Sequence, residues 1–226
     1  MGTTPRVLAG GVVYHVLNRA NDRRRIFQTA GDYIAFLDTF VEAQRLYPDI
    51  LCFAFCVMPN HWHLVLRPEH EGELTDFLHW MTTTHAKRWR AFHRSEGHGH
   101  LYQGRFKSFP VQDDGHFLTV CRYVERNSLR AQLVERAELW RWSSVGYRTQ
   151  GIHGLQSPIA LHEWPVRRPH DGLQWINRPL APAEIETVRH AVQHGRPFGT
   201  PDWCERIADR LGIQLTPHPR GRPRKH

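Results

Sequence analysis

The hydrophobic residues among the first 130 positions follow two kinds of spacing, one typical of strands and one typical of helices. Short β-branched or alternating runs predict strands at 12–19, 50–57, 61–67 and 101–112. Longer stretches with apolar residues every three or four positions predict helices at 31–47, between residues 68 and 95, and at 114–130. The resulting order, β-α-β-β-α-β followed by a helix, predicts an α+β fold of the ferredoxin-like kind, an antiparallel sheet with helices on one face.

The two later helices are amphipathic. In the long middle helix, one face carries Leu74, Phe77, Leu78, Met81, His85 and Phe92, and the other side is basic. In the helix at 114–130, four apolar residues point inward: Phe117, Val120, Cys121 and Val124.

A change in composition past residue 150 marks the boundary that we expect between two parts of the chain. Proline becomes frequent there, and short helices at 183–193 and 202–211 precede a basic tail. We therefore predict a main domain at 1–150 and a small helical, basic C-terminal extension at 151–226, with no internal repeat.

The composition of the 226 residues is that of a globular protein, since 40% of them are hydrophobic. No apolar run approaches the roughly 18 residues that a membrane span needs, and the N-terminal run lacks a signal-peptide cleavage pattern. We expect a cytoplasmic protein without membrane contact. The four cysteines form no C-x-x-C pair, which argues against a disulfide framework and against a cysteine zinc site.

The charge balance favours a polyanionic partner. The formal net charge is +8, and 27 of the 30 basic residues are arginine. The planar guanidinium group forms bidentate hydrogen bonds with phosphate. A GC-rich genome would also raise the arginine content, so charge makes nucleic acid the favoured partner without establishing it.

Two histidines on the third predicted strand are the first candidates for metal ligands. Side chains alternate along a strand, so His61 and His63 point the same way, about 7 Å apart, and could share one metal ion. The chain contains two other close pairs, His98 with His100 and His190 with His194. The former lies in a glycine-rich loop, and the latter has no carboxylate or nucleophile candidate nearby, so we favour the strand pair.

Tyr123 and Asn127 form the second group of candidates. Four residues apart on a helix, they emerge on one face. A tyrosine hydroxyl can act as a nucleophile, and an amide oxygen can bind a hard metal ion. Tyr123 could equally be a half-buried aromatic residue of the core, and spacing alone leaves both interpretations open.

Several basic residues could follow the backbone of a nucleic acid. Arg105 and Lys107 share a face of the fourth predicted strand, and Arg122, Arg126 and Arg130 recur every four residues beside the tyrosine. For each of them a solvated surface is an equally good interpretation.

The tail at 219–225 reads Pro-Arg-Gly-Arg-Pro-Arg-Lys. Its Arg220 and Arg222 resemble the core of an AT-hook, in which extended arginine side chains lie in a narrow A·T minor groove. The alternative is a disordered basic tail that gives only nonspecific affinity.

Three segments together resemble a known family. Residues 55–68, with Pro-Asn directly before the strand pair of histidines, resemble the signature of the single-tyrosine HUH transposases. Residues 122–131 are similar to the helix that carries their tyrosine, and residues 14–19 are similar to their opening strand. With the basic tail, the chain is identified as a member of the REP-associated tyrosine transposases. The resemblance covers most of residues 10–148 and departs at 128–129, where the family more often has Pro-Val.

This resemblance implies a site and a mechanism. A divalent ion, Mg²⁺ or Mn²⁺, would be held by His61, His63 and Asn127, and Tyr123 would attack the scissile phosphate, giving a 5′-phosphotyrosine and a free 3′-OH. The partner would be single-stranded or hairpin DNA of REP-like palindromes, and the protein would be nucleoid-associated. Related transposases act as dimers or as monomers, so both oligomeric states stay open.

Three interpretations of the function follow. The first is a metal-dependent single-stranded DNA endonuclease and strand transferase acting on REP-type hairpins. The alternative is a catalytically silent, hairpin-binding regulator, against which the intact set of four site residues argues. A third interpretation, a hydrolytic metalloenzyme using His61 and His63, lacks the nearby carboxylates that such sites usually show.

Overall fold

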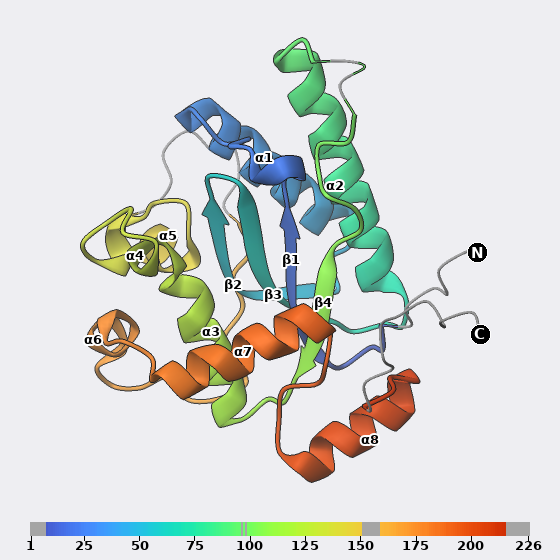
Figure 1. The fold of residues 1–226 in the computed structure, drawn as a ribbon, viewed down its shortest axis with the longest axis vertical. Coiled ribbons are helices and arrows are strands. Elements are labelled where there is room, and N and C mark those ends of the chain that lie inside the picture. The colour runs from blue at the N-terminus through green and yellow to red at the C-terminus, as the bar shows by residue number, and fades with distance from the viewer. Residues whose placement is uncertain (1–7, 96, 98, 151–158, 216–226) are drawn as a thin grey trace, which may run out of the picture.

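Four strands make one antiparallel sheet in the computed structural model, which describes residues 8–95, 97, 99–150 and 159–215 (Figure 1). The strands are β1 (Val13–Arg19), β2 (Ile50–Met58), β3 (His61–Pro68) and β4 (Lys107–Val111). Their order is β2-β3-β1-β4, and each neighbouring pair is antiparallel. This arrangement confirms the predicted ferredoxin-like α+β fold.

Two helices, α1 (Ala30–Leu46) and α2 (Glu73–Phe92), pack against each other and cover one face of the sheet (Figure 1). A capping box begins α1, in which the side chains of Thr29 and Asp32 each accept from the backbone N–H of the other residue. Trp62, Leu64 and Leu66 of β3 point into this layer and are buried. Because side chains alternate along a strand, the histidines of β3 are left for the opposite face.

Of the six residues that the sequence places on one face of α2, five are buried and one is not. Phe92 is the last residue of the helix, and 79% of its surface is exposed. The helix runs past the edge of the sheet at this end (Figure 1), so no apolar layer is left to cover the ring.

The opposite face of the sheet is covered by α3 (Gly115–Glu125) and α4 (Asn127–Arg130), where the sequence predicts one helix at 114–130. The helix is interrupted at Arg126, whose ψ of 1° lies outside the α-helical range. All four of its predicted inward residues are buried. The sheet therefore lies between two apolar layers, with α1 and α2 on one side and α3 on the other.

β4 is shorter than the strand predicted at 101–112. Gly104 adopts a φ of +155°, which residues with a side chain rarely adopt, and the chain bends around it. Arg105 consequently precedes β4, and Lys107 begins it. The sequence predicts that Arg105 and Lys107 share a face of one strand. This prediction is wrong, because only Lys107 belongs to β4.

The C-terminal part of the chain adds side chains to both apolar layers. Its helices are α5 (Ser144–Gln150), α6 (Gly172–Asn177), α7 (Pro182–His194) and α8 (Pro201–Leu211). Earlier in the chain, short 3-10 helices lie at Asn21–Arg23 (η1) and Ala137–Leu139 (η2). The two predicted C-terminal helices are α7 and α8. Val188 and Phe198 join the layer under α3, and Ile207 joins the layer under α1 and α2.

The predicted division into 1–150 and 151–226 stays a prediction. Residues 151–158, directly after that boundary, and the tail at 219–225 lie outside the described residues. Within the part of the chain that the structure describes, no helix is both long enough and apolar enough to cross a bilayer.

Candidate active site

The hairpin between β2 and β3 presents two histidines on the α3 side of the sheet. Its turn is held by three backbone hydrogen bonds from the N–H groups of residues 20, 26 and 27. His61 and His63 follow directly on β3, and their ring centroids lie 4.9 Å apart with 79° between the ring planes. As the strand alternation predicts, both rings point to the same face.

The side chain of Asn60 fixes the tautomer of His61. Its Nδ1 lies 2.6 Å from the side-chain oxygen of Asn60, which can only accept, so Nδ1 carries the hydrogen and Nε2 keeps a lone pair. Burial, followed by the charges of Arg19 and Arg130, lowers the pKa of His61 to about 3. A neutral imidazole with a free lone pair is the form that binds a metal ion.

His15 on β1 is a site residue that the sequence analysis did not single out. Its Nε2 lies 2.9 Å from Nδ1 of His63, and the two rings are stacked, with 5.0 Å between centroids and 10° between planes. Burial lowers the pKa of His15 to about 3 and that of His63 well below its ordinary value, so both rings are neutral. One hydrogen therefore lies between them, and Nε2 of His63 has a free lone pair only if His63 donates it.

A signal for His15 was present in the sequence. It is a histidine in the middle of a strand whose neighbours are apolar, and it is 0% exposed. A buried polar side chain at such a position needs a hydrogen-bond partner. The sequence could not say that the partner is a residue of β3.

Tyr123 on α3 lies edge-on to the two stacked imidazoles. Its ring centroid is 6.1 Å from that of His63 and 6.3 Å from that of His15, with 84° and 87° between the ring planes. The tyrosine is 6% exposed and belongs to the apolar layer under α3. The ring thus packs in the core, as expected of a core aromatic residue. It also contacts the histidines, as expected of a nucleophile beside a metal site.

Arg130 joins Tyr123 to Asn127. Its guanidinium carbon lies 4.5 Å from the centroid of the tyrosine ring, and its Nη2 donates to Oδ1 of Asn127 at 2.6 Å. The same charge contributes to lowering the pKa of His61 and of His63. The structure therefore gathers the four predicted site residues around this arginine.

The donor atoms of the site suit a divalent cation in kind. Two neutral imidazoles and the amide of Asn127, whose oxygen has a second lone pair beside Arg130, are available. Asn127 is 2% exposed, and its Nδ2 is buried without a partner among the described residues. In that part of the chain no three His, Cys, Asp or Glu side chains are placed to share a metal ion. Two imidazoles and one amide oxygen are three neutral ligands, so phosphate oxygens or water would complete the coordination of a bound ion.

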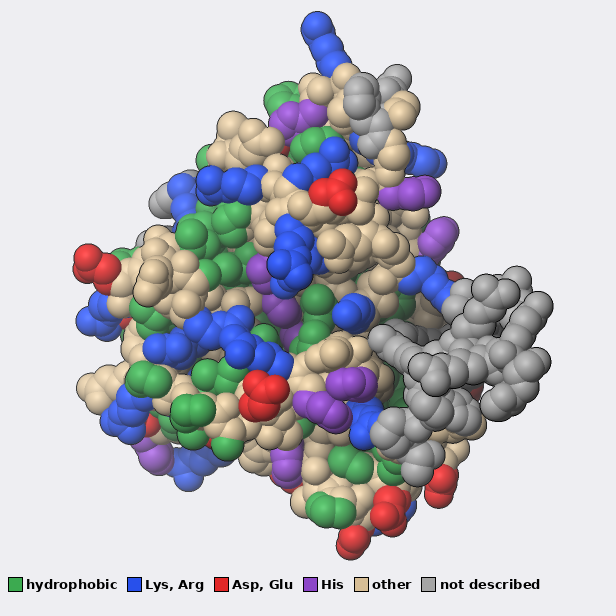
Figure 2. Space-filling model, viewed as in Figure 1, with side chains coloured by type: hydrophobic (Ala, Val, Ile, Leu, Met, Phe, Trp, Pro, Cys, Tyr) green, Lys and Arg blue, Asp and Glu red, His purple; other side chains and the backbone are tan. Residues whose placement is uncertain are grey.

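A basic groove of about 380 Å³ opens beside this site. Arg19, Arg105 and Lys107 line one side, and Val192 and Gln193 of α7 line the other. Arg105 and Lys107 are exposed, as the sequence prediction of phosphate contacts requires. Figure 2 shows Lys and Arg side chains around histidine side chains near the middle of this face.

Two of the predicted DNA-binding arginines hold the C-terminal part of the chain. Arg122 donates through Nη2 to the carbonyl oxygens of residues 178 and 179, at 2.7 and 3.0 Å, and lies 5.2 Å from the ring centroid of Trp175. Arg126 donates through Nε to the carbonyl oxygen of Asn177 at 3.3 Å. A contact of either residue with DNA stays a prediction.

The remaining candidates lie apart from these residues or outside the description. His190 and His194 are exposed on α7, with ring centroids 4.2 Å apart, and Nδ1 of His194 bonds to the carbonyl oxygen of His190. His100 is exposed, whereas His98 lies outside the described residues. The same holds for Arg220 and Arg222 of the tail, so their place on DNA stays a prediction.

Comparisons with known proteins identify similar structures and a family. A structure of a REP-associated tyrosine transposase bound to a REP hairpin superposes with a TM-score of 0.53 at 16% identity, covering 72% of this chain and 94% of the other. A Deinococcus radiodurans R1 protein designated a transposase reaches a TM-score of 0.37 at 19% identity, covering 59% of this chain and 89% of the other. No curated protein sequence matches this chain significantly.

The family match is to the model described as "Transposase IS200 like", over residues 10–127. This segment is more than half of the chain, and it contains His61, His63, Tyr123 and Asn127. The chain therefore belongs to the IS200-like transposase family and has the fold of a REP-associated tyrosine transposase.

Proposed function

We propose that the protein cleaves and rejoins single-stranded DNA at REP-type palindromic hairpins, with Tyr123 as the nucleophile. The observation that carries this proposal is the position of the tyrosine ring, edge-on and 6.1 Å from His63 in a cluster of neutral imidazoles. A REP-associated tyrosine transposase with the same fold binds a REP hairpin, which supports this class of substrate. The DNA backbone would approach along the groove lined by Arg105 and Lys107.

The chemistry is a transfer between two phosphate esters. The Tyr123 oxygen forms a bond to the scissile phosphorus while the bond from phosphorus to the 3′ oxygen breaks. The phenolic proton passes to water and the leaving oxygen takes up a proton, so the products are a 5′-phosphotyrosine and a free 3′-OH. The charge of Arg130, 4.5 Å from the ring centroid, stabilises the negative charge that develops nearby. Because the ester bond is conserved, a 3′-OH can reseal the strand without ATP.

His61, His63 and Asn127 would hold Mg²⁺ or Mn²⁺, and the family generally uses a divalent metal. When bound there, such an ion would supply Lewis acidity at the scissile phosphate. His15 would serve this site indirectly: with its own hydrogen on Nδ1, its Nε2 accepts the Nδ1 hydrogen of His63, which keeps Nε2 of His63 available. Imidazole and amide ligands favour Mn²⁺ on softness, whereas cellular abundance favours Mg²⁺.

Strand cleavage and hairpin binding, measured side by side, test this proposal. A labelled hairpin oligonucleotide is incubated with Mg²⁺ or Mn²⁺ and with the wild type, Tyr123→Phe, His61→Ala or His63→Ala. We expect the three variants to lose cleavage and to keep hairpin binding, because binding rests on arginines and bases. Cleavage by Tyr123→Phe at the wild-type rate would show that another group is the nucleophile.

A hairpin-binding regulator without catalysis is the second candidate. It is favoured by the closed state of the site, in which Tyr123 is 6% exposed and Oδ1 of Asn127 is bonded to Arg130. The same experiment separates the two functions. A regulator would bind the hairpin as tightly as its variants do, and none of the proteins would cleave it with either metal ion.

A further inference from the structure

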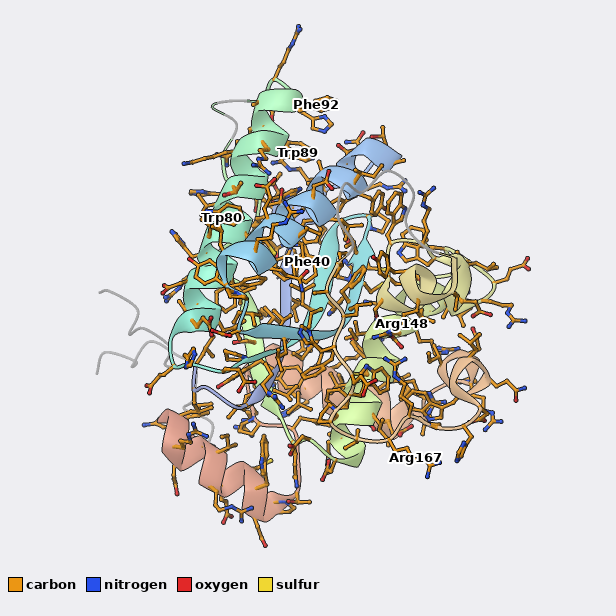
Figure 3. All side chains as sticks on the ribbon, turned by 180° about the vertical axis from the view of Figure 1, so that it is seen from behind. Phe40, Trp80, Trp89, Phe92, Arg148 and Arg167 are labelled. Carbon is orange, nitrogen blue, oxygen red and sulfur yellow. The ribbon has the colours of Figure 1, made fainter. Side chains whose placement is uncertain are left out.

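A second cavity lies across the sheet from the histidines of the candidate site. Its volume is about 310 Å³, and it opens between the first turns of α1 and the last turns of α2. Figure 3 shows Trp89 and Phe92 on the side of α2 that faces α1. The volume lies in the range of pockets that hold small ligands, roughly 300–1,000 Å³.

The base of this cavity holds a hydrogen-bond donor without a partner. The indole N–H of Trp62 can only donate, so the hydroxyl oxygen of Tyr102 accepts it at 3.1 Å. Nδ1 of His85 lies 2.8 Å from the same oxygen, and if it accepts the hydroxyl hydrogen, both polar atoms are paired. Burial lowers the pKa of His85 to about 3, so the ring is neutral and its one N–H is then at Nε2. Among the described residues this buried nitrogen has no partner.

Two aromatic rings and one hydrogen bond fix the orientation of the His85 ring. Phe27 stacks on the ring at a centroid distance of 5.6 Å, and Phe36 meets it at 5.2 Å with 85° between planes. Tyr102 occupies the Nδ1 side, and His85, which is 2% exposed, lines the cavity. An unpaired buried donor is destabilising, and a ligand that brings an acceptor removes this cost.

Aromatic rings form the wall of the cavity along α2. The rings of Trp89 and His93 stack with 4.2 Å between centroids and 29° between planes. The indole N–H of Trp89 donates to the carbonyl oxygen of Ile26 at 2.7 Å, which fixes that ring. Phe92 lies beside His93 and is 79% exposed. Such rings offer stacking surfaces to flat ligands.

The charged groups of the cavity are already engaged. Asp32 accepts from Nε2 of His93 at 2.7 Å, and Arg88 forms two hydrogen bonds of 2.8 Å with the carboxylate of Glu42. Arg24 places a positive charge 5.5 Å from the centroid of the Trp89 ring. A fitting ligand therefore has a flat ring, an acceptor on the edge of that ring, and a negative charge outside it.

We infer that this cavity binds one unpaired nucleobase of the DNA. An acceptor on the edge of the base takes the hydrogen bond of His85 Nε2–H, the ring packs against Phe92 and Trp89, and the adjoining phosphate lies toward Arg24. The inference rests on the proposed function, since it needs bound DNA. It gives the protein a second contact with the hairpin, across the sheet from Tyr123.

Single abasic substitutions along a hairpin oligonucleotide test the inference. Affinity is measured without divalent ions for the wild type, Phe92→Ala, His85→Phe and the control Leu46→Ala, whose side chain is 56% exposed at the end of α1. One abasic position should weaken wild-type binding about tenfold. Phe92→Ala should bind the intact hairpin about tenfold more weakly and lose the abasic penalty. His85→Phe should lose part of that penalty, and Leu46→Ala should keep all of it.

Because Phe92 is exposed, its variant decides the matter even if His85→Phe does not fold. The inference is overturned if the hairpin binds and no abasic position depends on Phe92. The proposed function fails by a different result, namely cleavage by Tyr123→Phe, whatever the abasic series shows.

Discussion

A hydrogen bond between two neutral imidazoles decides which nitrogen of His63 is available to a ligand. Without an acceptor at its Nδ1, the ring could place its hydrogen on Nε2, and that nitrogen would lose the lone pair that a metal ion needs. His15 Nε2, 2.9 Å away, supplies the acceptor when the hydrogen of His15 lies on its own Nδ1. Partners of this kind, which hold a metal-binding histidine in one tautomer, strongly affect metal affinity.

The substitution His15→Phe tests this role. It keeps a ring of similar size and removes the acceptor, so we expect cleavage at limiting Mn²⁺ to fall about 10- to 100-fold and to recover in part at high Mn²⁺. Hairpin affinity should not change. The measurement is the cleavage rate across a Mn²⁺ titration, with His190→Phe, at an exposed position of α7, as the control. An unchanged Mn²⁺ dependence would show that His15 does not set the tautomer.

Local spacing made part of the site predictable. His61 and His63 follow from alternation along a strand. The helical repeat also predicted Tyr123 with Asn127, although the helix is interrupted between them at Arg126. His15 lies 48 residues before His63 and meets it only through the antiparallel register of β1 and β3. Pairings that depend on register have no local signature in a single sequence.

At the scale of elements, the tyrosine helix is fixed from its outer side by the C-terminal part of the chain. Arg122 and Arg126, one turn apart, donate to three carbonyl oxygens in residues 177–179, between α6 and α7. These bonds hold the end of α3 that carries Tyr123. The sequence predicts phosphate contacts for both arginines, and it contains no feature that indicates an intramolecular partner.

Arg122→Ala should therefore destabilise the protein. It removes two hydrogen bonds to carbonyl oxygens and the contact with the Trp175 ring, so we expect the free energy of unfolding to fall by about 1–3 kcal/mol. Urea unfolding measures this change.

Arg105→Ala is the matched control, because Arg105 is exposed beside the groove. It should change the free energy of unfolding by less than about 0.5 kcal/mol and reduce the salt dependence of DNA binding by the equivalent of about one phosphate contact. The anchoring account is wrong if Arg122→Ala leaves stability unchanged and instead lowers the salt dependence in the same way.

Most element bounds could be predicted, and the failures have identifiable causes. The strand predicted at 101–112 is cut short because Gly104 adopts a positive φ, which the sequence permits without requiring. The helix predicted at 114–130 is interrupted at Arg126, a residue that gives no sign of a break by itself. Phe92 matches the apolar period of α2, but the period does not show where the sheet beneath it ends.

For the whole molecule, the order of elements was enough to predict the fold. Three antiparallel strand pairs and two helices on one face follow from the β-α-β-β-α-β order. The packing of residues 159–215 could not be predicted in the same way, because proline-rich connections carry no hydrophobic period. Those residues add Val188 and Phe198 to one apolar layer and Ile207 to the other.

Buried histidines make the stability of the fold sensitive to acid. The pKa of His85 is lowered to about 3 by burial, against about 6.5 in an unfolded chain. Between these values the unfolded state binds a proton that the folded state does not, so the free energy of unfolding falls as the pH decreases from 6.5 toward 3. The contribution of one such histidine is about 1.4 kcal/mol per pH unit.

The variant His85→Phe lacks this contribution. Between pH 4 and pH 6 its free energy of unfolding should therefore fall less steeply than that of the wild type, by about 1.4 kcal/mol per pH unit. Urea unfolding at several pH values measures both slopes without DNA or metal. Equal slopes would mean that His85 is protonated in the folded state.

The position and polarity of the covalent bond test the central claim most directly. A hairpin oligonucleotide with different labels at its two ends is incubated with the protein and Mn²⁺, separated on a denaturing gel, and the adduct is digested for mass spectrometry. We predict that the adduct keeps the 3′ label, that the 5′-labelled fragment leaves with a 3′-OH, and that the modified peptide contains Tyr123. An adduct on another residue, a 5′ label on the protein, or cleavage without an adduct would contradict the account.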